Sequence, residues 1–232
     1  MISIENISKS FGKQEVLKNI SVSMNSNECV ALIGPNGSGK TTLIKSVLGM
    51  VPIVSGDILI DRASIKNNFR YREMIGYMPQ IGRYPDNMNI GQVIQLMKNI
   101  RPNATDIDES LIDNFKLREL YGKKMRTLSG GTRQKVSACI AFLFNPKILI
   151  LDEPTAGLDP LSSEILKDKI LHEKEKGKLI IITSHVLSEL EDMITRVIYM
   201  HDGNIKIDAS LDDLLLQTGE NKLGKIISKA LN

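Results

Sequence analysis

The side chains best suited to chemistry lie in one glycine-rich segment, which reads Gly34-Pro35-Asn36-Gly37-Ser38-Gly39-Lys40-Thr41-Thr42. It fits the pattern G-x-x-x-x-G-K-[ST], in which backbone N–H groups surround phosphate oxygens. Gly37 and Gly39 let the backbone approach an anion closely, because glycine carries no Cβ atom. Lys40 would place a positive charge on the β- and γ-phosphates, and the Thr41 hydroxyl would ligate Mg²⁺. The segment therefore predicts a phosphate-binding site.

The sequence on either side of residues 34–42 predicts the elements that would hold this loop. The apolar run 29–33 indicates a buried strand, and the apolar spacing of residues 43–48 indicates a helix. The first turn of such a helix offers unpaired N–H groups and the positive end of the helix dipole. The alternative is a glycine turn with a surface lysine, which would not need every motif position to be filled. We call residues 34–42 the P-loop.

Two acidic side chains follow a second apolar strand. Four apolar residues, 148–151, predict a central strand that is covered on both faces, and Asp152 and Glu153 come directly after it. An acid at the carboxyl end of a strand beside the P-loop strand would point into the same crevice. Asp152 would hold Mg²⁺ through water, and Glu153 would orient or deprotonate the water that attacks the γ-phosphate. Acids that merely cap a strand are the alternative, which the upstream P-loop disfavours.

A second glycine motif, Leu128-Ser129-Gly130-Gly131-Thr132-Arg133-Gln134, repeats the physical logic of the P-loop. A serine N-cap and two glycines at a helix start form another anion site, although they could also be a simple capping turn. The predicted helix leads straight into the strand before Asp152. Here the chain resembles the ATP-binding-cassette (ABC) ATPase family, whose signature is close to L-S-G-G-Q. Ser129, Gly130 and Gly131 match that signature, and Thr132 replaces the usual Gln.

The resemblance covers nearly the whole chain in the family's order, and it implies roles for residues outside these motifs. It implies that Phe11 stacks on adenine, although Phe11 alone is more simply read as an edge aromatic over the core. It also implies that Gln80 senses the γ-phosphate and the membrane partner. We therefore group Gln80 with Thr41 and Asp152 around Mg²⁺. His185 matches the switch histidine, which contacts the γ-phosphate.

The resemblance further implies a dimer. Residues 156–159 match the D-loop, so that Asp159 is expected at the subunit interface and near the nucleotide. In this family the signature of one subunit closes over the P-loop of the other, and two ATP molecules are buried between them. One P-loop and one signature in this chain therefore imply a homodimer, or a heterodimer with a related ATPase chain.

Composition sets limits on partners and location. The 232 residues carry a formal net charge of +3 and only 4% aromatic residues, which does not indicate a nucleic-acid partner. No run approaches about 18 apolar residues, so no segment is expected to span a bilayer. The resemblance then implies a separate integral-membrane permease subunit. The N-terminus lacks the pattern of a signal peptide, and Cys29 and Cys139 are expected as buried free thiols, which suits a reducing compartment. We therefore expect a cytoplasmic protein, peripheral on the inner face of the cell membrane.

These patterns together predict an α/β fold with a P-loop NTPase core, a mostly parallel central sheet, an N-terminal antiparallel β subdomain and an inserted α-helical subdomain. Residues 1–80 and 129–210 would form the core with the β subdomain. Residues 81–128 would form the helical subdomain, in which Asn89 would cap a helix. Residues 211–232 would form a helical tail, and Ser188-x-x-Glu191 would be a capping box at the start of a short helix.

The function expected from the resemblance is that of a Mg²⁺-dependent ATP-hydrolysing subunit of a transporter, coupling dimer closure to a membrane subunit. The alternatives are a soluble non-transport ABC ATPase, such as an assembly factor, and a P-loop kinase. Three segments, 78–85, 129–135 and 184–187, are similar to bacterial ABC ATPases of nitrous-oxide-reductase maturation clusters. That similarity would imply a part in supplying the copper-sulfur centre of the reductase.

Overall fold

The computed structural model describes residues 1–231, whose larger sheet has the strand order β10-β9-β3-β8-β7-β6. These strands are β10 (Asn204–Ser210), β9 (Arg196–His201), β3 (Cys29–Ile33), β8 (Leu179–Thr183), β7 (Ile148–Asp152) and β6 (Ile75–Met78). Every pairing from β9 to β6 is parallel, and β10 pairs with β9 in the antiparallel sense. The mostly parallel central sheet is confirmed.

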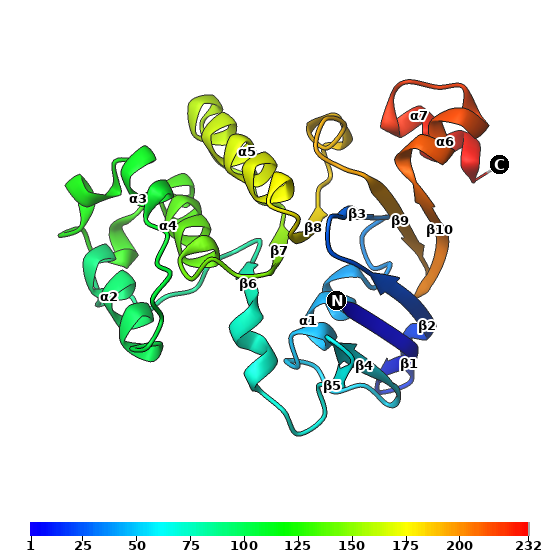
Figure 1. The fold of residues 1–232 in the computed structure, drawn as a ribbon, viewed down its shortest axis with the longest axis horizontal. Helices are drawn as coiled ribbons and strands as arrows, with labels where there is room; N and C mark the ends of the chain where they lie inside the picture. Colours follow the sequence, from blue (N-terminus) through cyan, green and yellow to red (C-terminus); the bar gives the residue numbers. More distant parts are fainter. Residues whose placement is uncertain (232) are drawn as a thin grey trace.

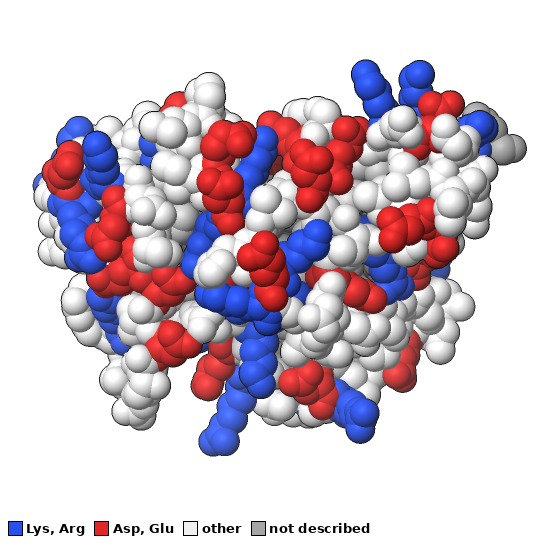
Figure 2. Space-filling model, turned by 45° about the horizontal axis from the view of Figure 1, so that its top comes forward, with Lys and Arg blue, Asp and Glu red and all other residues white. Residues whose placement is uncertain are grey.

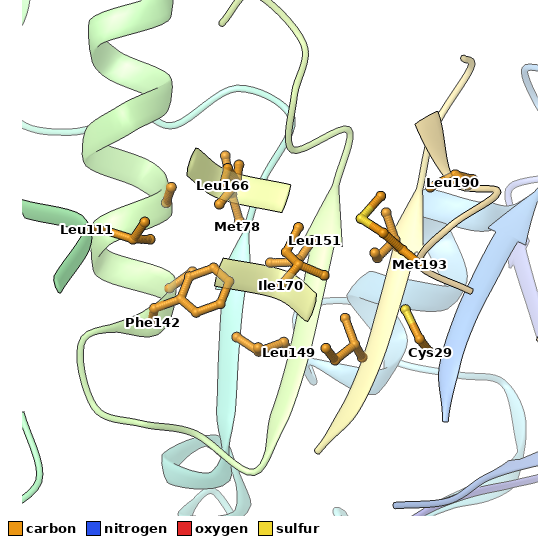
Figure 3. Close-up of a cluster of buried hydrophobic side chains, with 14 of the residues drawn as sticks. Cys29, Met78, Leu111, Phe142, Leu149, Leu151, Leu166, Ile170, Leu190 and Met193 are labelled. Atoms are coloured by element: carbon orange, nitrogen blue, oxygen red, sulfur yellow. The ribbon is translucent and has the colours of Figure 1, made fainter. Parts of the chain in front are cut away.

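The central strands β3, β7 and β8 are apolar up to the polar last residues of β7 and β8, because both faces of the sheet are covered. In β3, Cys29, Ala31 and Ile33 enter one buried cluster, whereas Val30 and Leu32 enter the other. This alternation is the two-residue period of a strand, with a core on each side. Figure 3 shows part of the first cluster, in which Leu149 and Leu151 of β7 lie among side chains that include Phe142, Ile170 and Met193.

The smaller sheet is antiparallel and has the order β2-β1-β4-β5 in the described residues. Its strands are β1 (Ile2–Phe11), β2 (Gln14–Met24), β4 (Ser55–Ile60) and β5 (Ala63–Ser64). Together with α1 (Lys40–Val47) it closes the second core cluster against the central sheet. The N-terminal antiparallel sheet is confirmed. Residues 29–33 do not belong to it, because β3 pairs in parallel with β8 and β9.

A group of helices lies to the left of the sheets in Figure 1. It contains α2 (Ile90–Ile100), α3 (Ser110–Asn114) and α4 (Gly130–Phe142), together with the short 3₁₀ helices η2 (Leu117–Leu120) and η3 (Met125–Thr127). The Asn89 side chain caps α2 in a capping box with Gln92, as the sequence predicts. Helix α4 contacts α2, α3 and β6, so it joins this group to the central sheet. We propose that residues 81–128 form the helical subdomain.

The remaining helices lie over the sheet and at the C-terminal end of the chain. Helix α5 (Pro160–Glu175) follows β7, and η1 (Arg70–Met74) precedes β6. The C-terminal residues form α6 (Leu211–Thr218) and α7 (Leu223–Ala230), on the opposite side of the molecule from α2 and α3 (Figure 1). A helical C-terminal tail is therefore observed.

The capping box predicted at Ser188 is wrong. The chain there forms one 3₁₀ turn, η4 (Leu187–Glu189), and no side chain caps it. Instead the Ser184 hydroxyl accepts a hydrogen bond from the Val186 N–H at 2.9 Å. This contact turns the backbone at residues 184–186, before η4 begins. The Glu191 carboxylate is engaged elsewhere, because it accepts a hydrogen bond from the N–H of Leu223 at 2.8 Å.

The surface carries both signs of charge. Figure 2 shows basic and acidic side chains interspersed over the face that it presents, in keeping with the formal net charge of +3. Among residues 1–231, no helix is both long enough and apolar enough to cross a membrane.

Candidate functional site

A cavity of about 340 Å³ opens at the P-loop. Its size falls within the range of roughly 300–1,000 Å³ that is common for ligand pockets. Five separate parts of the chain line it, through Val16, Asn36, Gly37, Ser38, Gly39, Lys40, Thr41, Thr42, Gln80, Asp152, Glu153 and His185. Apart from Val16, these residues follow the carboxyl ends of β3, β6, β7 and β8, where parallel strands of an α/β sheet place their ligand sites. The structure thus brings the predicted P-loop, acids, glutamine and histidine together.

The acidic strand is not adjacent to the P-loop strand, contrary to the sequence-based expectation. Strand β8 lies between β3 and β7, and it pairs in parallel with both. Asp152 nevertheless reaches the cavity, because all three strands end at the same edge of the sheet. The residue that closes β8 is Thr183, which the sequence analysis did not single out.

Thr183 connects the two acids. Its hydroxyl donates a hydrogen bond to Asp152 Oδ1 at 2.5 Å and accepts one from the backbone N–H of Glu153 at 3.1 Å. Its side chain is buried, as is that of Asp152. One hydroxyl therefore fixes both the carboxylate of Asp152 and the backbone that carries Glu153. A hydroxyl residue at the end of an otherwise apolar run was the only signal in the sequence.

The lysine of the P-loop folds over the loop. Lys40 Nζ donates hydrogen bonds to the carbonyl oxygens of Gly34 at 2.7 Å and Pro35 at 3.1 Å. Burial lowers the pKa of Lys40, while the charges of Asp152 and Glu153 act in the opposite direction. Both of its hydrogen-bond acceptors are neutral, so its positive charge is available to an anion in the cavity.

The backbone of the P-loop requires glycine at the start of α1. Gly39 has a φ of 105°, and a Cβ atom there would lie 2.9 Å from the carbonyl oxygen of Val16. The neighbouring Ser38 hydroxyl is buried and has no hydrogen-bond partner among the described residues. Buried polar atoms are almost always satisfied, so this atom fits a cavity with a polar occupant.

The oxygen atoms around the cavity also fit a hard cation. Mg²⁺ at phosphate sites usually takes one or two protein oxygens and completes its shell with phosphate and water. The Thr41 hydroxyl and the Asp152 carboxylate both line the cavity and are of this type. Gln80, two residues after β6, also lines the cavity and carries an amide oxygen.

Glu153 and His185 are in direct contact. His185 Nε2 lies 2.9 Å from Glu153 Oε1, and the side chain of Glu153 is 18% exposed. Glu153 has a φ of 52°, in the left-handed region that non-glycine residues seldom adopt. The side chain of Gln134 on α4 donates hydrogen bonds to the carbonyl oxygens of Glu153 and Pro154, which hold this turn. Glu153 is therefore fixed at the mouth of the cavity, where it can accept a proton from water.

Comparison with known proteins identifies the family of this chain. A model of the family described as ABC transporter matches residues 17–156, more than half of the sequence. The chain belongs to the ABC transporter family. It is an ABC-type ATPase, which binds and hydrolyses ATP as the subunit of a transporter.

Individual relatives agree with this assignment. The chain is 34% identical to the lipopolysaccharide export system ATP-binding protein LptB of Haemophilus influenzae, over 88% of each chain. It is 33% identical to the uncharacterized ABC transporter ATP-binding protein YxlF of Bacillus subtilis, over 95% of this chain and 75% of that protein. A solved structure of an ATP-binding subunit of an ABC transporter superposes with a TM-score of 0.89 at 26% identity, covering 100% of both chains.

The signature of this ABC ATPase lies outside the P-loop cavity. Ser129 caps α4 and accepts a hydrogen bond from the Thr132 N–H at 3.2 Å, and the two hydroxyls lie 2.9 Å apart. A Cβ atom on Gly131 would approach the carbonyl oxygen of Gly157 to 2.6 Å, so the signature packs on the D-loop. None of Ser129, Gly130 and Gly131 lines the cavity of its own chain.

Two other predicted nucleotide contacts also lie outside this cavity. Asp159 caps α5 by accepting a hydrogen bond from the Ser162 N–H at 2.9 Å. Hydrogen bonding to Lys135 holds the pKa of Asp159 below its usual range. Phe11 is 52% exposed at the end of β1, with the ammonium of Lys9 4.9 Å from its ring centroid. Val16 of β2 lines the cavity, and the sequence analysis did not identify it.

Proposed function

We propose that two copies of this ABC ATPase enclose two ATP molecules, each between the P-loop of one copy and the signature of the other. The observation that carries this proposal is the division of the site. The P-loop, both acids and His185 line one cavity, whereas Ser129, Gly130 and Gly131 do not reach it. The signature is a helix start with a serine cap, a geometry that suits an anion. A second copy is the simplest source of that half of the site.

In this proposal each residue at the cavity has a defined role. Backbone N–H groups of the P-loop and the Lys40 ammonium bind the β- and γ-phosphates. Thr41 and Asp152, with Gln80 nearby, would hold Mg²⁺, which would supply positive charge to neutralise the phosphates. Water attacks the γ-phosphorus, and the bond between that phosphorus and the β–γ bridging oxygen breaks.

Glu153 accepts the proton of the attacking water, and ADP leaves with the electron pair of the broken bond. His185 Nε2 lies 2.9 Å from Glu153 Oε1, and its proposed role is to contact the γ-phosphate. Asp159 would lie at the dimer interface near the nucleotide, and Phe11 would stack on the adenine.

The membrane partner would dock in a second hollow, of about 290 Å³, which begins at the residue after Gln80. It is lined by Ile81, Gly82, Arg83, Tyr84, Asp86, Met125 and Arg133. Ile81 is 67% exposed and presents apolar surface beside the basic side chains of Arg83 and Arg133. A cytoplasmic segment of a separate permease would dock here, one residue beyond the glutamine at the γ-phosphate. The chain would then lie on the inner face of the cell membrane through that partner.

For the cargo, we propose a place in nitrous-oxide-reductase copper-sulfur centre maturation, on the strength of residues 78–85, 129–135 and 184–187. The alternative is a soluble assembly factor with the same ATPase cycle.

Purification from detergent-solubilised native membranes distinguishes a transporter subunit from a soluble assembly factor. Co-elution of a multispan protein, lost when Ile81→Asp and Arg83→Glu are introduced, supports the transporter. A complex free of membrane protein supports the assembly factor.

The dimer itself is tested by measuring mass in solution with Mg²⁺ and ATP. We expect Glu153→Gln to be a dimer with ATP and a monomer without it, and to release both nucleotides as ATP on denaturation. A Glu153→Gln protein that stays monomeric at saturating ATP, with ATP bound, contradicts the shared site. The partner could then not be a second copy of this chain.

A further inference from the structure

The C-terminal helix α7 packs on the segment that carries the switch histidine. Helix α7 contacts η4, the single turn that begins two residues after His185. A Cβ atom on Gly224 would lie 3.8 Å from Leu187 Cδ1, so the Leu187 side chain lies over that glycine. Beside this contact, α7 contributes apolar side chains to the same buried cluster as the residues after η4. They are Leu223, Ile226 and Ile227 from α7, and Leu190, Met193 and Ile194 from the switch side.

A polar contact fixes the start of α7 to the same segment. Lys222, the residue before α7, offers no side-chain cap. The Leu223 N–H instead donates to Glu191 Oε1 at 2.8 Å, across 32 positions of the sequence. Glu191 thus acts as an N-terminal cap for α7, which places a negative charge at the positive end of the helix dipole. At the other end of α7, Lys229 Nζ donates to the Thr218 carbonyl at 2.5 Å and ties α7 to α6.

The turn after Glu153 also contacts the switch segment. Thr155 Oγ1 donates to Glu189 Oε2 at 2.5 Å. The segment from His185 to Glu191 therefore contacts both Thr155 and α7. Its own backbone supplies one 3₁₀ turn, which is a weak element alone. Contacts from outside must decide how often it adopts the geometry in which His185 meets Glu153.

We propose that α7 is a positioning element for His185, and that Glu191 is the positioning residue through which it acts. This inference rests on the proposed role of His185 in hydrolysis. When α7 is docked, Leu187 and Glu191 are fixed, and His185 Nε2 stays at the cavity, 2.9 Å from Glu153 Oε1. When α7 loosens, the switch segment loses its contacts with Leu223 and Gly224, and the fraction of molecules with His185 in place falls. ATP binding at the P-loop is unaffected, because no residue of α7 lines that cavity.

The test is the steady-state ATPase activity of the full chain carrying Glu191→Ala. Losing one hydrogen bond to a charged group predicts a fall in kcat of about five-fold or more, with KM for ATP unchanged. Glu191→Gln keeps an oxygen that accepts the Leu223 N–H and is expected to retain most of kcat. Leu216→Ala, at a residue of α6 that is 84% exposed, is the matched control and should match the wild type. Unchanged kcat in Glu191→Ala would overturn the inference.

A double-variant cycle separates this inference from the proposed function. His185→Ala should lower kcat strongly, and Glu191→Ala should then add nothing, because its effect passes through His185. If His185→Ala has no effect, the proposed role of the histidine fails. If His185→Ala acts but Glu191→Ala lowers kcat equally in both backgrounds, only the positioning by α7 is overturned.

A variant in the apolar contact guards against misfolding. If Glu191→Ala lowers the melting temperature too far for assay, Ile226→Val removes one methylene from the α7 side of the cluster and leaves the rest folded. The inference then requires a selective, smaller fall in kcat with KM unchanged. Wild-type kcat in a folded Ile226→Val protein would overturn it.

Discussion

His185 Nε2 lies 2.9 Å from Oε1 of Glu153 at the mouth of the P-loop cavity. The two side chains come from the ends of neighbouring parallel strands, β8 and β7, so the contact depends on the register of the sheet. It joins the proposed base of hydrolysis to the proposed sensor of the γ-phosphate.

Glu153→Gln should retain ATP binding and stop hydrolysis. The amide keeps the shape of the side chain but cannot accept a proton, and a positioned base typically contributes about 10²–10⁴-fold to the rate. Phosphate release measures the loss, and equilibrium binding of ATP measures what is retained. Asp192→Asn, at an exposed acid beyond η4, is the control. Wild-type turnover in Glu153→Gln would show that another group is the base.

Thr183→Val should lower kcat by about ten-fold or more, because Asp152 loses its donor and a buried polar partner is left unpaired. Valine has nearly the shape of threonine, so the apolar end of β8 remains filled. Thr183→Ser restores the hydroxyl and should recover most of the activity. The dependence of ATP binding on Mg²⁺ concentration is a second readout, since Asp152 is proposed to hold the cation. Equal activity of the valine and serine variants would contradict the role of the hydroxyl.

Gly130→Asp should abolish hydrolysis while leaving the isolated chain folded. A Cβ atom at Gly130 meets no atom within 4 Å, so the larger side chain has room in one copy and obstructs only the partner's nucleotide. Lys40→Ala should also abolish hydrolysis, but it should do so by weakening ATP binding at the P-loop of its own chain.

Mixing these two variants gives a sharper result. In a mixed dimer, one site combines both defects and the other combines an intact P-loop with an intact signature. We expect ATPase activity to reappear on mixing, although each variant alone is inactive. Absence of complementation, with mixed dimers shown to form, would contradict the shared site.

Glu173→Gln should destabilise the protein by about 3–5 kcal/mol, because it removes the buried negative charge that pairs with several lysine ammonium groups. The Glu173 side chain is 1% exposed, and it meets the ammonium groups of Lys169, Lys176 and Lys178. Lys169 also pairs with Asp108 before α3, so this cluster joins α5 to the helical group. Urea unfolding measures the change, with Glu164→Gln in the exposed pair with Lys167 as the control.

The same cluster predicts loss of stability in acid. Burial alone would raise the pKa of Glu173, but hydrogen bonds from its lysines lower it from 4.5 to about 2. Burial likewise opposes the hydrogen bonds from Lys169 and Ser110 that lower the pKa of Asp108 from 3.8 to about 2. Both carboxyls are more acidic in the folded chain, so their contribution is complete above the unfolded pKa values. It is lost as the pH falls from about 5 to about 2.

Unfolding free energies across that range should therefore fall steeply in the wild type. They should fall less in Asp108→Asn, which is already weaker at neutral pH. An identical pH slope in the two proteins would show that Asp108 is not linked to folding in this way.

The parts of the site that were predicted from sequence are those that local patterns encode. The P-loop, the acids after β7 and the Asn89 cap each depend on neighbouring residues, and the structure has the expected loop, strand end and capped helix there. Strand order is not local, and so β8 was not expected between β3 and β7. Thr183 was missed for that reason, because its partners come from a strand about 30 residues earlier.

The error at Ser188 has the same origin. A capping box is a local pattern, but Glu191 has a partner in α7, and tertiary contact overrode the local preference. Likewise Val16 reaches the cavity from a different sheet, which no spacing within β2 reveals.

The folded-over lysine of the P-loop has a consequence for the kinetics of nucleotide binding. Lys40 is held by the Gly34 and Pro35 carbonyls instead of extending into solvent. The loop is therefore preorganised. When a phosphate arrives, only the Lys40 ammonium has to move, from the two carbonyl oxygens to a phosphate oxygen. Little conformational entropy is lost at that moment, which favours association near the speed set by diffusion. Substitutions around the loop should therefore alter the residence time of the nucleotide far more than its rate of arrival.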